Sequence, residues 1–282
     1  MNNRIIKIFL SVLFMMPLMS YSQTDPVLLK ASFLFQKNEL PELVSLLNSD
    51  PGNNTDASMW YLLRAKSRYH LNDFNGARKD FSWLDQNGES GLASIYLARI
   101  AWLTGDRRTA FEKLRKHLAS NEKLPYSKII GDSVFKDLER DREWISFWSD
   151  VKYEQFDDLL EESNYQLSLD SPDTQVFTDF ISKYPESAMS WDAHARFMSK
   201  QNNKRRAESD FESALKINSN NTSILTNYAD FLAETDKFNE ALNNYQKVLD
   251  INPYLPDIWI KLISTQIASG KQQDARYNLN KL

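Results

Sequence analysis

Cationic and aromatic side chains alternate at a fixed interval in the first half of the chain. Lys66 lies three residues before Tyr69, and Arg99 lies three residues before Trp102, while Phe35 lies 34 residues before Tyr69. Side chains three residues apart share one face of a helix. Such a face can pair its cations with carboxylates and bury apolar groups of a ligand against its rings. The alternative is that the rings pack between neighbouring helices while the cations are solvated.

Catalytic chemistry has no comparable signal in this sequence. It contains no G-x-S-x-G, H-E-x-x-H, P-loop or G-x-G-x-x-G pattern. It also has no cysteine, which excludes disulfides, thiolate metal sites and a cysteine nucleophile. We therefore expect no catalytic residue, no metal and no cofactor, and a protein that is not an enzyme.

A repeat of 34 residues organises the elements that must position these side chains. Ala207, Ala241 and Ala275 are 34 residues apart, and so are Trp191, Leu225 and Trp259. In this register the second unit is one residue short, and residues 125–153 are an insertion of 29 residues. The seven units begin at Thr24, Ser58, Gly91, Glu154, Ala188, Thr222 and Pro256.

Three kinds of column recur within the units. The eighth and twentieth positions are mostly alanine, which lets two helices approach closely. The twenty-fourth position is always large and apolar or aromatic, from Leu47 to Leu279. The fifteenth position carries residues that favour a turn at a helix end, namely Asn38, Asn72, Gly105, Ser168, Asn202, Asp236 and Gly270. Each unit is therefore predicted to be two antiparallel helices, and the fold class is all-α.

These units resemble tetratricopeptide repeats. The unit from Thr222 matches the family pattern through a large residue, two small residues, an aromatic and a proline, which are Leu225, Ala229, Ala241, Tyr245 and Pro253. The first unit departs from the pattern at Leu43, and the fourth departs at Glu161 and Asp173. Residues 154–187 are therefore either a divergent repeat or two irregular helices that share its spacing. The resemblance implies a right-handed α-solenoid.

The resemblance also implies a function and a site. Tetratricopeptide arrays bind peptides or extended protein segments in a concave groove lined by the first helix of each unit. The corresponding groove residues here are Phe35, Lys66, Tyr69, Arg99, Trp102, Arg196, Asn227 and Lys261. Some family members clamp a C-terminal carboxylate with lysine, asparagine and arginine. We expect no such clamp, because Asp192 and Asp257 stand at two of those positions.

The remaining candidates for chemistry have structural explanations. His117 and His194 fall at positions that pack between helices, and His70 lies in another unit, which favours structural roles over metal ligation. The acidic segments 48–56 and 169–174 lack the twelve-residue spacing of a calcium-binding loop. The insertion is rich in apolar and aromatic residues, and we expect them to cover the helix faces that a break in the solenoid exposes.

The chain begins with a pattern typical of a secretory signal peptide. Arg4 and Lys7 precede an apolar stretch, and small residues follow around Ser22. We expect cleavage before Gln23, export to the periplasm or secretion, and no membrane insertion afterwards. Removing the two cations changes the net charge from −4 to −6, which argues against nucleic acid as a partner.

The predicted organisation is thus a signal peptide at 1–22, tetratricopeptide-like units at 23–124, a helical insertion at 125–153 and further units at 154–282. We expect a scaffold that binds a protein or peptide ligand. The alternative is an accessory or recognition subunit of an envelope enzyme or carbohydrate-handling machine. The last unit is also a candidate for self-association, because Ile263, Ile267, Leu279 and Leu282 could be partly exposed there.

Overall fold

The computed structural model describes residues 24–49, 51–52, 56–138, 140–151 and 153–282. The predicted signal peptide lies outside these residues. Every regular element among them is a helix, which agrees with the expected all-α class. No helix in these ranges combines the length and apolar character needed to cross a membrane.

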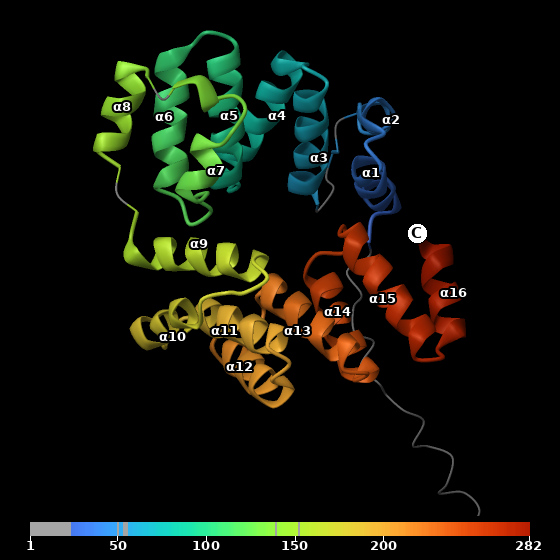
Figure 1. The fold of residues 1–282 in the computed structure, drawn as a ribbon. Helices are drawn as coiled ribbons and strands as arrows, with labels where there is room; N and C mark the ends of the chain where they lie inside the picture. Colours follow the sequence, from blue (N-terminus) through green and yellow to red (C-terminus); the bar gives the residue numbers. More distant parts are fainter. Residues whose placement is uncertain (1–23, 50, 53–55, 139, 152) are drawn as a thin grey trace, which may run out of the picture.

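Seven helix pairs follow the predicted register (Figure 1). The first helices of the pairs are α1 (Pro26–Gln36), α3 (Ala57–His70), α5 (Ser90–Leu103), α9 (Gln155–Ser168), α11 (Ala188–Lys200), α13 (Thr222–Glu234) and α15 (Pro256–Ala268). The second helices are α2 (Leu40–Leu46), α4 (Phe74–Gln86), α6 (Arg107–Leu118), α10 (Thr174–Lys183), α12 (Lys204–Ile217), α14 (Phe238–Ile251) and α16 (Gln272–Lys281). Consecutive pairs pack on each other from α1 to α6 and again from α9 to α16, which makes a solenoid of tetratricopeptide-like units with the insertion between its third and fourth pairs.

The turn inside most units follows from the residue at the fifteenth position. Asn72 has a φ of 60°, and the next residue, Asp73, donates its backbone N–H to the carbonyl oxygen of Arg68 at 2.9 Å. This is the closure typical of a helix end with a left-handed residue. The side chain of Asp73 then accepts from the N–H of Gly76 and caps α4. Positive φ angles recur at Asn38, Gly105, Asn202, Asp236 and Gly270.

The fourth unit turns differently. Ser168 is the last residue of α9, and it has no positive φ although it stands at the same position. A longer connection leads to α10, where the Asp173 side chain caps the helix by accepting from Gln175. The unit is nevertheless a helix pair, because α9 packs on both α10 and α11. Glu161 and Asp173 therefore change the turn and the packing without removing the unit.

The predicted alanine columns lie between helices. Ala229 and Ala241, on α13 and α14, are both fully buried, and the alanines at equivalent positions of the other units are buried as well. The twenty-fourth position is also buried from Leu47 to Tyr245, whereas Leu279 in α16 is 62% exposed. In the last unit Ile267 is exposed too, while Ile263 is buried and Leu282 packs against the core.

Two units contain a buried polar pair that joins their two helices. Arg64 in α3 binds Asp80 in α4 through two N–H groups, at 2.9 and 3.0 Å. His194 in α11 binds Asp210 in α12, with 2.6 Å between the ring nitrogen and the carboxylate oxygen. Sixteen residues separate the partners in both cases. The repeat therefore positions a polar link at one place in the core, and removing one partner would leave a buried charge.

The insertion covers the end of the first three units, as expected. It contains α7 (Tyr126–Ile130), a short 3-10 helix η1 (Lys136–Leu138) and α8 (Arg142–Ser149). Phe135, Trp144 and Phe147 are buried in one cluster with Ile95 of α5 and Phe111 of α6. These contacts support the packing interpretation of its aromatic residues.

The first and last units meet, which the repeat pattern did not predict. In Figure 1, α1 lies next to α15 at one end of the two rows of helices, and α9 connects the rows at the other end. Leu28 and Leu29 of α1 share a core cluster with Trp259 and Leu262 of α15. The side-chain amide of Gln36 also donates to Asp257. The array therefore closes on itself.

Candidate binding surface on the first helices

The predicted aromatic residues of the first units lie on neighbouring first helices. The ring centroid of Phe35 in α1 is 6.2 Å from that of His70 in α3. The ring of Tyr69 in α3 lies 5.3 Å from that of Tyr96 in α5 and nearly perpendicular to it. Both Phe35 and Tyr69 keep part of their surface exposed. They therefore pack between helices and also contribute to the surface, so neither interpretation of these rings excludes the other.

Lys66 is a half-buried cation in the same region. It forms no ion pair or hydrogen bond with any residue that the structure describes, although burial has removed much of its water. Burial, together with the positive charge of Arg99, lowers the pKa of Lys66 below its usual value. An unpaired cation in such a place favours an anion that can approach it.

Arg99, at the equivalent position of the next unit, is already paired. Its Nε atom donates to an Asp132 carboxylate oxygen at 2.6 Å, and its guanidinium lies 4.9 Å from the Tyr96 ring centroid. Trp102 contacts the insertion too, with its ring centroid 6.3 Å from that of Phe135. Arg107 lies 4.5 Å above the Trp102 ring. The structure thus brings all five predicted residues of the first units onto one surface, but the insertion covers two of them.

The three predicted residues of the later units are occupied by neighbouring side chains. Arg196 donates to the Asn164 side chain at 3.0 Å, and Lys261 binds Asp230 at 2.6 Å. Asn227 donates to both oxygens of the Asp192 carboxylate, at 3.0 and 3.1 Å. Arg196 and Asn227 line a shallow hollow of about 190 Å³ between α11 and α13. All three side chains are therefore bound by other residues of the array.

Asp192 is a buried carboxylate on this surface. Its side chain is 1% exposed, and burial raises its pKa to about 6. The hydrogen bond from Asn227 and the nearby charge of Arg196 oppose this shift. The carboxylate also occupies a position where a carboxylate-clamping repeat would offer a cation. A ligand carboxylate would be repelled there.

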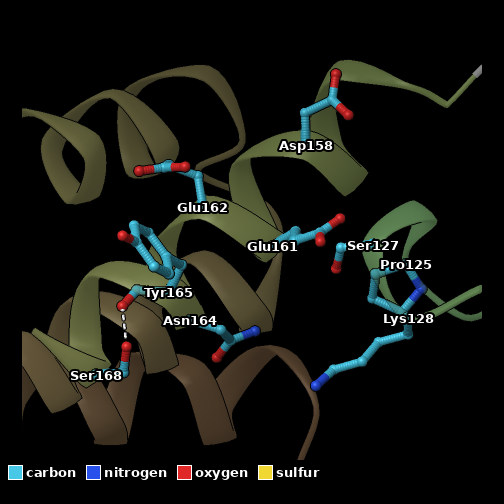
Figure 2. Close-up of a pocket in the computed structure, with 9 residues that line it drawn as sticks. All are labelled: Pro125, Ser127, Lys128, Asp158, Glu161, Glu162, Asn164, Tyr165 and Ser168. Carbon is cyan, nitrogen blue, oxygen red and sulfur yellow. Dashed lines mark hydrogen bonds between the residues drawn. The ribbon is translucent and has the colours of Figure 1, made fainter. Parts of the chain in front are cut away.

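The sequence analysis missed a cavity beside α9. It measures about 680 Å³ and lies between α9 and the start of the insertion (Figure 2). Figure 2 shows Glu161 pointing from α9 toward Ser127, while Lys128 extends from the other wall toward the part of α9 that carries Asn164. The lining residues are Pro125, Ser127, Lys128, Asp158, Glu161, Glu162, Asn164, Tyr165 and Ser168.

The α9 wall of this cavity uses the same repeat positions as the predicted groove. Glu162 and Tyr165 stand at the ninth and twelfth positions, where Lys66 and Tyr69 stand in the second unit. Tyr165 is 57% exposed, and neither Asp158 nor Glu161 forms an ion pair with a described residue. The repeat register therefore indicates Glu162 and Tyr165 as groove residues. The sequence analysis did not include them among the predicted groove residues, and their unit departs from the repeat pattern at Glu161 and Asp173.

Metal binding finds no support among the described residues. They contain no group of three or more His, Asp or Glu side chains placed to hold a metal ion. The buried ring of His117 accepts from the Leu124 N–H at 2.8 Å and faces the Gly91 carbonyl oxygen at 2.9 Å. His194 is paired with Asp210. Both histidines therefore have the structural roles that their positions predicted.

This chain is similar to known proteins in its fold. No protein-family model matches the chain, and no curated protein matches it. A thermophilic TPR protein of Thermus thermophilus is 14% identical, with a TM-score of 0.32 over 86% of this chain and 97% of that one. The TPR2AB domain of yeast Sti1, solved as a pHSP90 complex, is 15% identical, with a TM-score of 0.32 over 90% and 95%.

A third solved structure is Acl4, an assembly chaperone of RpL4, covering its residues 1–338. It is 15% identical, with a TM-score of 0.37 over 90% of this chain and 99% of that one. Scores in this range do not carry an argument about the site. The assignment rests on the register, the buried alanines and the left-handed turns of the chain itself. The chain is a tetratricopeptide-like helical-repeat protein.

Proposed function

We propose that this protein is a non-enzymatic scaffold that holds a segment of another protein against the surface formed by its first helices. The observation that carries this proposal is the cavity of about 680 Å³ beside α9. It joins an exposed tyrosine, Tyr165, with two carboxylates, Asp158 and Glu161, that form no ion pair with any residue that the structure describes. Aromatic rings and charges that remain accessible are typical of surfaces that recognise peptides.

The first helices of the first two units offer accessible groups of the same kinds. Lys66 adds a cation that is unpaired among the described residues, and Phe35 and Tyr69 add rings that are partly exposed. A surface that offers carboxylates, a cation and aromatic rings suits a peptide segment of mixed composition better than a small apolar ligand. The engagement of His117 and His194 in structural contacts supports a role without catalysis.

We also propose that the protein acts after export, in a bacterial envelope or outside the cell. This proposal rests on residues 1–22, with their early cations, apolar stretch and small residues before Gln23. Intact-mass measurement of exported protein tests it, with a mature chain that begins at Gln23 as the expected result. Retention of Met1 in the exported form would contradict it.

Selection of peptides from a random display library tests the scaffold role. The purified chain from Gln23 to Leu282 would be the target, and binding of the selected peptides would be measured by fluorescence polarisation. Tyr165→Ala should weaken binding by about tenfold or more, because aromatic residues dominate the energy of such contacts.

Tyr277→Ala is the matched control, since Tyr277 is 72% exposed on α16 and lines none of the described pockets. Its binding should equal that of the unaltered chain. Failure to select any peptide, or equal loss in both variants, would contradict the proposed function.

A further inference from the structure

The third unit already holds a peptide-like segment of its own chain. Residues 131–135 of the insertion, Gly-Asp-Ser-Val-Phe, lie against α5. The Asp132 carboxylate binds Arg99 at 2.6 Å, and the Phe135 ring meets the Trp102 ring at an angle of 74°. These are the cation and the aromatic ring at the ninth and twelfth positions of the unit. The insertion therefore makes the two contacts that such a pair offers to a ligand.

A tight turn presents both side chains of this segment together. The Phe135 N–H donates to the Asp132 carbonyl oxygen at 2.9 Å, and the Val134 N–H donates to the Asp132 side chain at 2.9 Å. The carboxylate and the ring are thereby held three residues apart on one side of the turn. A short segment with this spacing needs little further ordering to make both contacts.

The second unit offers the same pair without a partner for its cation. Lys66 and Tyr69 stand where Arg99 and Trp102 stand in the third unit. The Lys66 ammonium has no ion pair or hydrogen bond among the described residues, and Tyr69 keeps part of its ring exposed. Burial has removed much of the water around this ammonium, so an anion that reaches it is favoured.

We propose that the second unit binds a partner segment that carries a carboxylate and, three residues later, an aromatic ring. Lys66 pairs with the carboxylate, and Tyr69 contacts the ring, as Arg99 and Trp102 do with Asp132 and Phe135. The inference rests on the proposed scaffold function and names the chemistry of the partner. It also explains why a half-buried lysine is tolerated without an intramolecular partner, since binding would supply one.

A synthetic peptide that copies residues 130–136, with blocked ends, is the direct probe. It would be added to the chain from Gln23 to Leu282, and binding would be followed by NMR chemical-shift changes. We expect saturable binding that weakens with salt. Peptides with Asp132→Asn or Phe135→Ala should bind at least tenfold more weakly, because each loses one of the two contacts.

Variants of the protein locate the site. Lys66→Met should weaken binding at least tenfold, while Lys66→Arg should retain it. Lys79→Met is the matched control, because Lys79 is exposed on α4 of the same unit and should bind as the unaltered chain does. Retention by Lys66→Arg separates a lost contact from a misfolded variant.

Three results would overturn the inference. The peptide could fail to bind at all, it could bind Lys66→Met as well as the unaltered chain, or it could bind the two altered peptides equally. The second result would indicate that the peptide displaces the insertion from Arg99. Peptides selected by display that depend on Tyr165 but not on Lys66 would leave the scaffold function standing while refuting this site.

Discussion

The hydroxyl group of Tyr254 contacts the carboxylate of Asp56, which lies 198 residues earlier in the chain. The same hydroxyl accepts a hydrogen bond from the backbone N–H of Asp25 at 3.2 Å. Tyr254 lies two residues before the last unit, whereas Asp25 and Asp56 directly precede α1 and α3. One side chain thereby ties both ends of the array together.

We predict that Tyr254→Phe weakens this closure. The change removes a partly buried hydrogen bond to a carboxylate, and hydrogen bonds to charged groups contribute about 1.5–3 kcal/mol. Amide hydrogen exchange in α1 should become faster, and the melting temperature should fall. Tyr277→Phe on the exposed face of α16 is the control and should change neither. Unchanged exchange in α1 after Tyr254→Phe would show that the apolar contacts alone hold the ends together.

His117 should make the stability depend on pH. Its ring accepts a backbone N–H at one nitrogen, so a proton added there would meet a donor. Burial, and to a smaller extent the charge of Arg99, lower the pKa of His117, while the Gly91 carbonyl opposes this shift. The stabilisation is fully present above the ordinary histidine pKa of about 6.5 and is lost as pH falls toward the lower folded-state value.

Melting temperatures of the unaltered chain and His117→Gln, measured from pH 7.5 to 5, test this effect. The variant should be less stable at pH 7.5, and the gap between the two proteins should narrow as the pH falls. A gap that stays constant across this range would rule out a contribution from His117 protonation.

Asp192 should affect the pH dependence of stability in the opposite direction to His117. Its folded-state pKa of about 6 lies above the usual value of 3.8, so the folded chain retains a proton that the unfolded chain releases. Stability is therefore lost as pH rises from about 4 to about 6. Asp192→Asn should raise the unfolding free energy at pH 7.5 by about 1–3 kcal/mol, and by much less at pH 4.

Asp158→Asn is the control for Asp192, since this exposed carboxylate lies on α9. It should leave the unfolding free energy nearly unchanged at both pH values. If Asp192→Asn destabilises the chain at pH 7.5, the hydrogen bonds from Asn227 outweigh the cost of burying the charge.

The alanine columns predict a steric result. Ala229 is fully buried between α13 and its neighbours, so Ala229→Leu should overpack the crossing and cost about 1–3 kcal/mol. Ala268→Leu, at an exposed position on α15, is the control. Chemical denaturation would measure both. Equal midpoints for the two variants would mean that Ala229 does not limit how closely the helices approach.

The features that could be predicted from the sequence depend on local chemistry. Asn72 and Asp236 turn the chain because short polar side chains tolerate a left-handed backbone. Ala229 and Ala241 pack because a unit of 34 residues repeats the same crossing. Each of these effects depends on contacts within one helix pair. The position of a residue in the repeat was therefore sufficient to predict its role.

The features that could not be predicted depend on how several units curve together. The pairing of Arg99 with Asp132 requires the insertion to fold back onto α5, and no repeat position indicates that. The contact between Tyr254 and Asp56 requires the curvature summed over every unit between them. The α9 cavity could be predicted in part, because Tyr165 occupies a groove position that the register already indicated.

Site-specific photo-crosslinking tests the central claim most directly. A benzophenone amino acid would replace Ser168, which lines the cavity beside α9, or Ser149, an exposed serine of α8 outside it. Within the described part of the chain, each hydroxyl group donates to a carbonyl oxygen of its own helix and to no other residue, so the two replacements are matched. With a peptide selected by display, we expect crosslinks from position 168 and none from position 149. Crosslinks from position 149 without any from position 168 would contradict binding on the first helices.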